Sequence, residues 1–190
     1  MSHRVLSVFL FLSGAAALVL EVAWFRRLAQ VAGATSVALA AILAAVIGGM
    51  AAGALLFGRR ADRTRRPLRL YATLELGVTF AALASPWAFD RVGPLFTALH
   101  RAIGHLPALH LAAGFVVASL LLAPATLLLG GSLPAAAAAL AAPPEVRGRR
   151  LGVLYGVNTL GAVAGTCLAG FVLLPALGLA GTMRAAAALA

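Results

Sequence analysis

Two acidic residues, Glu21 and Glu75, lie inside long apolar stretches of this 190-residue chain and are its first candidates for chemistry. A carboxylate at the centre of a membrane costs roughly 3 kcal/mol on insertion scales, so such a side chain faces protein or water rather than lipid. For Glu21 two interpretations stay open. It forms a site for a proton or a cation, or it is a structural group that pairs with an arginine such as Arg26 or is protonated and hydrogen-bonded.

Glu75 belongs to a polar stripe. Tyr71, Glu75 and Thr79 recur every four residues, which places them on one face of a helix. The carboxylate could serve a cavity jointly with Glu21, or it could extend toward Arg69 in the neighbouring arginine-rich segment. The second interpretation is favoured because Glu75 lies near that end of its apolar run.

Three polar side chains on a later apolar stretch could contribute to the same site. Tyr155, Asn158 and Thr159 share one face of a helix, and a buried asparagine requires hydrogen-bond partners. Glycines near them favour tight packing instead, because small residues four apart let two helix backbones approach closely. Pairs with this spacing are Gly49 with Gly53, Gly152 with Gly156, and Gly161 with Gly165.

Metal, phosphate and nucleophile chemistry finds little support in the residue pattern. His100, His105 and His110 are spaced by five, which turns successive side chains about 140° around a helix, so we expect loop or interface positions. The single cysteine, Cys167, has no partner for a disulfide or a cysteine metal site. The absence of lysine rules out the usual phosphate-binding loop. We therefore expect no catalytic residue, no cofactor and no metal in this stretch.

The candidate residues need elements that lipid can solvate. Hydrophobic residues make up 63% of the chain, charged residues 11%, and the mean hydropathy is +1.02, which is too apolar for a soluble domain. About 20 apolar residues span a hydrocarbon core of roughly 30 Å as a helix, so we expect one all-α, multi-pass transmembrane domain over 1–190. About six transmembrane helices are predicted, at 5–25, 35–57, 70–89, 111–141 and 151–175, with the start of a sixth from 178.

The arginines predict how this domain is oriented. All fifteen basic residues are arginines, and ten of them fall at Arg4, between Phe57 and Leu70, or within 143–150. Because cations resist translocation, these segments and the N-terminus are predicted to be cytoplasmic, with the domain in the cell inner membrane. Arg26 is among the five on the other side. The net charge is +10, but the arginines lie at the ends of apolar stretches without interleaved aromatics, so we expect the lipid bilayer as partner and no nucleic acid.

Two segments depart from simple spans. The stretch 111–141 contains Pro124 and Pro134 and is too long for the bilayer, so it is predicted to bend, break or project. The segment 93–106 has apolar residues at helical spacing and is predicted to form a short interfacial helix. From 178 only 13 residues remain, so the chain is expected to be part of a longer protein.

Several motifs along the chain form a recognisable order. They are Glu21-Trp24-Arg26, Asp62-Arg63 with Pro67 to Tyr71, Glu75-Leu76-Gly77, Pro124 to Gly130 with Leu133-Pro134, and Leu154-Tyr155 with Asn158-Thr159 through Leu174-Pro175. Together they resemble the membrane region of fused, transporter-like spermidine synthases, over about residues 8–184. In that family a soluble domain follows the membrane helices and joins the aminopropyl group of decarboxylated S-adenosylmethionine to putrescine, and this synthase domain is absent from residues 8–184.

The segment with Gly58, Asp62, Arg63 and Arg66 also resembles the motif between the second and third helices of major facilitator transporters. It departs from that motif, because Arg65 replaces a glycine and Pro67 replaces a basic residue. The resemblance implies a fold like half of a major-facilitator bundle.

These likenesses imply a membrane domain that anchors a C-terminal synthase domain and binds or passes polyamines, since an amine cation is drawn to Glu21 and Glu75. Two alternatives stay open: a self-associating half-transporter for a small cationic solute, and a non-catalytic membrane scaffold. The chain alone is not expected to be an enzyme.

Overall fold

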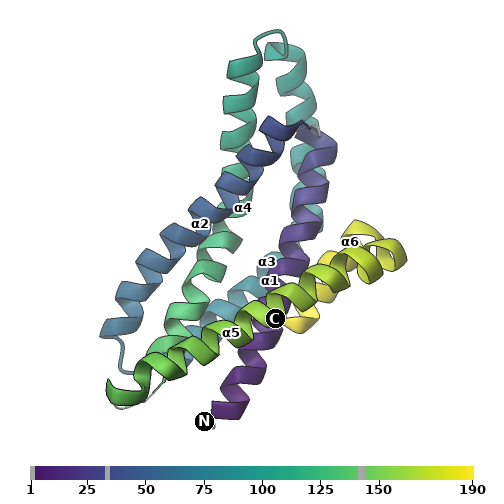
Figure 1. Ribbon diagram of the computed structural model, residues 1–190. Coiled ribbons are helices and arrows are strands. Elements are labelled where there is room, and N and C mark those ends of the chain that lie inside the picture. The colour runs from purple at the N-terminus through teal and green to yellow at the C-terminus, as the bar shows by residue number, and fades with distance from the viewer. Residues whose placement is uncertain (1–2, 33–34, 141–143) are drawn as a thin grey trace.

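The computed structural model describes residues 3–32, 35–140 and 144–190, and every regular element in them is a helix. The all-α prediction is therefore confirmed. The helices follow one another with short connections and pack as a bundle with one projecting hairpin (Figure 1). They are α1 (His3–Ala32), α2 (Ser36–Arg63), α3 (Pro67–Ile103), α4 (Pro107–Ala138), α5 (Pro144–Leu168), the π-helical turn η1 (Ala169–Leu173) and α6 (Leu174–Leu189).

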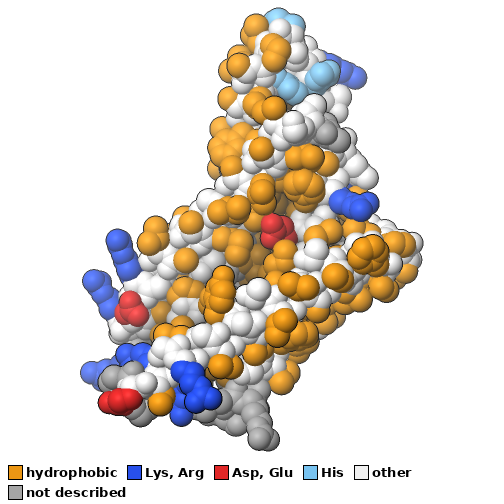
Figure 2. Space-filling model, viewed as in Figure 1, with side chains coloured by type: hydrophobic (Ala, Val, Ile, Leu, Met, Phe, Trp, Pro, Cys, Tyr) orange, Lys and Arg blue, Asp and Glu red, His pale blue; other side chains and the backbone are white. Residues whose placement is uncertain are grey.

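The described chain has five helical stretches long and apolar enough to cross a membrane. Their outer surfaces carry large apolar side chains, among them Phe80, Leu120 and Phe171, which are 75%, 71% and 83% exposed. Figure 2 shows such side chains along the whole visible length of the bundle. A surface of this kind is suited to lipid rather than water. The five stretches are Val5–Gln30, Ser36–Arg63, Pro67–Ile103, Pro107–Ala138 and Glu145–Leu189.

The helices run further than the apolar stretches predicted, so much of the expected arginine loop is helical. α2 continues to Arg63 and ends where the Thr64 N–H donates to the Arg60 carbonyl oxygen. Pro67 then begins α3, since a proline suits the first helical turn, where its missing N–H costs nothing. Only 64–66 connect the two helices. Gly58, Asp62 and Arg63 therefore lie on α2, Arg66 lies in the connection, and Arg147, Arg149 and Arg150 lie on α5.

The predicted interfacial helix at 93–106 is wrong, because α3 runs on without a break to Ile103. Pro86 lies inside α3 and cannot donate to the Ala82 carbonyl four residues back. The Ser85 hydroxyl donates to that carbonyl oxygen instead, at 2.8 Å, which satisfies the freed group. α3 and α4 form the hairpin that projects at one end of Figure 1.

α4 is a continuous helix despite Pro124 and Pro134. The stretch was predicted to bend, break or project, and it does not break. Its middle packs closely on α2. A methyl group added at Gly53 would overlap the Leu127 carbonyl oxygen, and one at Gly130 would overlap that of Met50. The glycines of both helices thus allow backbone-to-backbone contact.

The chain bends back after α5. Gly178 has φ +65° and ψ −173°, a conformation that side chains with a Cβ rarely adopt. Beyond it, Thr182, Met183 and Ala186 are buried, and α6 packs against α1 and α3. A new helical segment near 178 is thus confirmed, while its role as a sixth span stays a prediction.

Candidate functional site

The polar stripe on α3 points into the bundle. Glu75 is 7% exposed, and the hydroxyl of Ser13 on α1 donates to its Oε1 at 2.8 Å. Tyr71, one turn before it, is also buried, and the Thr79 hydroxyl donates to the Glu75 carbonyl oxygen at 3.0 Å. The favoured interpretation, an extension of Glu75 toward Arg69, is wrong because burial against α1 offers the carboxyl group a hydroxyl partner.

Three side chains surround this carboxyl group, so that the cluster draws on three helices. Ser13 comes from α1, Tyr71 and Glu75 from α3, and Ser132 from α4, and each is less than a tenth exposed. The Ser132 hydroxyl donates to the Leu128 carbonyl oxygen at 3.3 Å and lies beside Glu75. We call these four residues the Glu75 cluster. No arginine forms an ion pair with Glu75 in the part of the chain that the structure describes.

The Glu75 cluster has unused hydrogen-bonding capacity. Oε2 of Glu75 is fully buried and lacks a hydrogen-bond partner among the described residues. A buried polar atom in that state costs about 1–3 kcal/mol, more when the group is charged. The carboxyl group can remove this cost by taking a proton or by accepting an N–H from a cationic ligand. These are the two forms of chemistry that the cluster supports.

Glu21 lies apart from this cluster. It is half-buried on α1, eight residues beyond Ser13, which corresponds to about 12 Å along the helix. Within the described ranges no ion pair joins it to Arg26; the pair in this region is Arg27 with Asp90, at 2.8 Å. The structural interpretation of Glu21 as an Arg26 partner is therefore wrong, and the two acids do not meet.

The three polar residues of α5 divide between two environments. Asn158 is half-buried and lies against Gly14 of α1, beside Ser13, so it faces the bundle next to the Glu75 cluster. Tyr155 is 62% exposed, and Thr159 is exposed and donates to the Tyr155 carbonyl oxygen at 2.9 Å. Of the three, only Asn158 faces α1, at the residue next to Ser13 of the cluster.

Ser13 and Ser132 are the members that sequence reasoning missed. Both stand beside glycines in apolar stretches, Ser13 before Gly14 and Ser132 after Gly131. A small hydroxyl residue next to a tightly packed glycine was the available signal, since such a position brings the hydroxyl to a helix interface.

The facilitator-like residues lie at the other end of α2. Gly58 and Asp62 border a hollow of about 540 Å³. Thr64, in the α2–α3 connection, and Arg147, on α5, line it as well. Arg63 and Arg66 are exposed and do not line it. The structure thus brings part of this motif beside α5.

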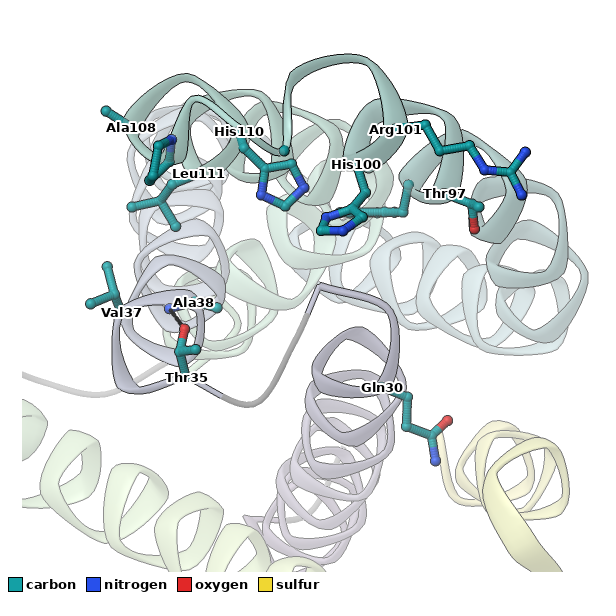
Figure 3. A pocket seen from close by; sticks show the side chains of 13 residues that line it. Gln30, Thr35, Val37, Ala38, Thr97, His100, Arg101, Ala108, His110 and Leu111 are labelled. Atoms are coloured by element: carbon teal, nitrogen blue, oxygen red, sulfur yellow. Dashed lines mark hydrogen bonds between the residues drawn. The ribbon is translucent and has the colours of Figure 1, made fainter.

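Two histidines that helical spacing would separate lie together at the tip of the molecule. The rings of His100 and His110 are 5.2 Å apart between centroids and edge to face (Figure 3). Helical spacing does not apply to them because α3 ends at Ile103 and α4 begins at Pro107, so the two rings face each other across the turn. They border a cavity of about 810 Å³ whose lining also includes Gln30, Thr97 and Arg101. The described residues contain no group of three or more histidine, cysteine or acidic side chains able to hold a metal ion.

Comparisons with known proteins do not identify a family. No protein-family model matches the chain, and no curated protein or solved structure matches it. The likeness to spermidine synthases and to facilitator transporters therefore rests on the motifs alone.

Proposed function

We propose that this chain is the membrane domain of a spermidine-synthase-like protein, and that the Glu75 cluster binds the amine cation of a polyamine. The domain lies in the cell inner membrane with its N-terminus in the cytoplasm and anchors a synthase domain that follows it. The observation that supports this proposal is the buried Glu75 carboxyl group, whose Oε2 lacks a partner among the described residues.

The surroundings of Glu75 favour a cation over an anion. Its neighbours are hydroxyl groups and no guanidinium pairs with it in the described chain, so an incoming ammonium group does not have to displace an arginine. Primary amines bring up to three N–H donors, which matches a site made of oxygen acceptors.

The test replaces the carboxylate without changing its size. We expect Glu75→Gln to weaken spermidine binding to the purified chain in lipid nanodiscs at least tenfold, because a hydrogen bond to a charged group is worth about 1.5–3 kcal/mol. Glu145→Gln, at an exposed position on α5, is the matched control and should bind as the parent does. Glu21→Gln shows whether the second acid takes part.

Equal spermidine binding by the parent, Glu75→Gln and Glu21→Gln would remove polyamine recognition from the proposal. The scaffold alternative predicts a stronger result, namely that the parent chain binds no spermidine at all. Flux of labelled spermidine into liposomes separates binding from passage.

A second candidate function, a self-associating half-transporter, is supported by the outward face of α5. Gly152 and Gly156 have open space where a Cβ would lie, so the predicted close packing at this pair is not met within one chain. Tyr155 and Thr159 are exposed beside them. Small and hydroxyl residues on an outer surface are typical of helix association in membranes.

Cys167 provides a direct test of that alternative. It is the chain's single cysteine, it is exposed, and it lies eleven residues, about three turns, beyond Gly156 on the same side of α5. If two copies pair through this face, a short bifunctional maleimide should crosslink them in native membranes, and Gly156→Leu should abolish the product. If the parent chain and Gly156→Leu both stay monomeric after treatment with the crosslinker, the half-transporter is excluded.

A further inference from the structure

Arginines gather at one end of the molecule without matching acids. Figure 2 shows blue side chains concentrated where α2 ends and α5 begins. The acids nearby in sequence are Asp62 and Glu145, and both are exposed. Eight arginines of this end form no ion pair among the described residues: Arg59, Arg60, Arg63, Arg65, Arg66, Arg69, Arg147 and Arg149. Their counter-charge must come from outside the described chain.

A groove at this end combines arginines with an apolar wall. It has a volume of about 370 Å³ and lies between the start of α1, the end of α4 and the first turns of α5. Arg149 and Arg150 line it together with Ser7. Val146 and Val153, which are 37% and 55% exposed, form part of its apolar wall. The remaining lining residues are Leu140 and Leu154.

We propose that this groove binds an acidic phospholipid, with the phosphate on Arg149 and Arg150 and the start of an acyl chain along Val146 and Val153. A guanidinium offers five N–H donors in a planar fork that suits phosphate oxygens, so Arg150 can bind a phosphate in addition to the contact it already makes. Basic pockets between membrane helices are recognised sites for acidic headgroups. The groove requires no polyamine and no particular orientation, so it is independent of the proposed function.

The charge of the headgroup follows from the lining. None of the described residues that line the groove is acidic, so a zwitterionic headgroup finds no partner among them for its ammonium group, whereas a headgroup with net negative charge leaves nothing unpaired. The apolar wall adds affinity for a lipid over a free phosphate ion. Phosphatidylglycerol is therefore the appropriate probe, with phosphatidylcholine and inorganic phosphate as comparisons.

The experiment titrates short-chain phosphatidylglycerol into the detergent-solubilised full chain. An arginine near an anionic lipid contributes about fivefold in affinity, equivalent to about 1 kcal/mol, so Arg149→Gln with Arg150→Gln should weaken binding about 25-fold. Arg59→Gln with Arg60→Gln removes the same charge from the exposed end of α2, outside the groove, and should weaken binding less than threefold. Val153→Ser should weaken binding of the lipid and leave inorganic phosphate unaffected.

Three results would overturn the assignment. The first is an equal loss of phosphatidylglycerol affinity in the two arginine double variants, which would mean diffuse attraction to the whole basic end. The second is an affinity for phosphatidylcholine equal to that for phosphatidylglycerol. The third is an affinity for inorganic phosphate equal to that for phosphatidylglycerol. If the double variant does not fold, Arg149→Gln alone replaces it, since that side chain is exposed, and it should weaken phosphatidylglycerol binding about fivefold.

Discussion

Arginines at the two ends of this bundle have different surroundings. Near the α3–α4 hairpin, Arg27 pairs with Asp90 at 2.8 Å, and the Arg91 guanidinium lies 4.9 Å from the centre of the Trp87 ring. At the opposite end, eight arginines have no ion pair among the described residues. Two arginines near the hairpin thus contact other side chains of the protein, and one of them joins two helices, whereas the eight at the opposite end pair with no described acid.

One of the five arginines predicted to lie on the non-cytoplasmic side, Arg27, is paired within the chain. Arg27 joins α1 to α3, so its charge is offset inside the molecule rather than presented to the membrane surface. Counting arginines by segment treats all of them alike. An arginine that pairs inside the chain contributes less to that count than one that does not, so Arg27 weighs less against the proposed orientation than its position alone indicates.

The largest expected effect comes from removing the unpaired charges. Replacing the six arginines between Phe57 and Leu70 with glutamine should leave the chain with mixed or inverted orientation, because these charges supply most of the asymmetry. A cysteine placed at Thr64 in a Cys167→Ala background reports the orientation through labelling of intact cells by an impermeant maleimide. Labelling of Thr64→Cys from outside in the Cys167→Ala chain that keeps all six arginines would contradict the proposed orientation.

A smaller effect is expected from breaking the ion pair. Asp90→Asn should lower the free energy of unfolding by about 0.5 kcal/mol, since the Asp90 side chain is 71% exposed and solvent screens the pair. Thermal unfolding in detergent, in a double-mutant cycle with Arg27→Gln, measures the coupling. A coupling of zero would mean that Arg27 is as unengaged as the arginines of the other end.

The smallest effect concerns Arg91 and Trp87. Arg91→Gln should reduce the free energy of unfolding by less than about 0.5 kcal/mol, at or below the low end for exposed cation–π pairs, because Trp87 is 63% exposed and the ring attracts the cation only weakly in such a setting. The matched control is Arg65→Gln in the α2–α3 connection, where no measurable change is expected. If both substitutions change the melting temperature equally, the two ends do not differ in this respect.

Hydrophobic length and glycine spacing predicted the parts of the fold that lipid and close packing determine. The five apolar stretches were predicted from their length, and close packing was predicted at Gly53 and Gly161 from their spacing. The structure has both contacts: a Cβ at Gly161, for example, would overlap the Phe11 carbonyl oxygen. The same spacing failed at Gly152 and Gly156, which face open space. Spacing shows that a helix can be approached, but not which of its sides meets a neighbour.

Long-range pairings were the part of the candidate site that could not be predicted. Glu75 was identified as a polar residue on the correct face of α3, but its partner Ser13 is 62 positions away on another helix. His100 and His110 meet because a turn intervenes, and helical periodicity carries no information across a turn. Both depend on how helices are placed against each other, which local patterns do not encode.

Gly178 has a consequence for the dimensions of the domain. Were its torsion angles helical, Glu145–Leu189 would form a straight rod of 45 residues, about 68 Å long and more than twice the thickness of a hydrocarbon core. The rod would carry its far end out of any bilayer and leave uncovered the parts of α1 and α3 against which α6 packs. The two backbone torsions of a residue without a side chain therefore shorten the reach of the last quarter of the chain and return its end to the bundle.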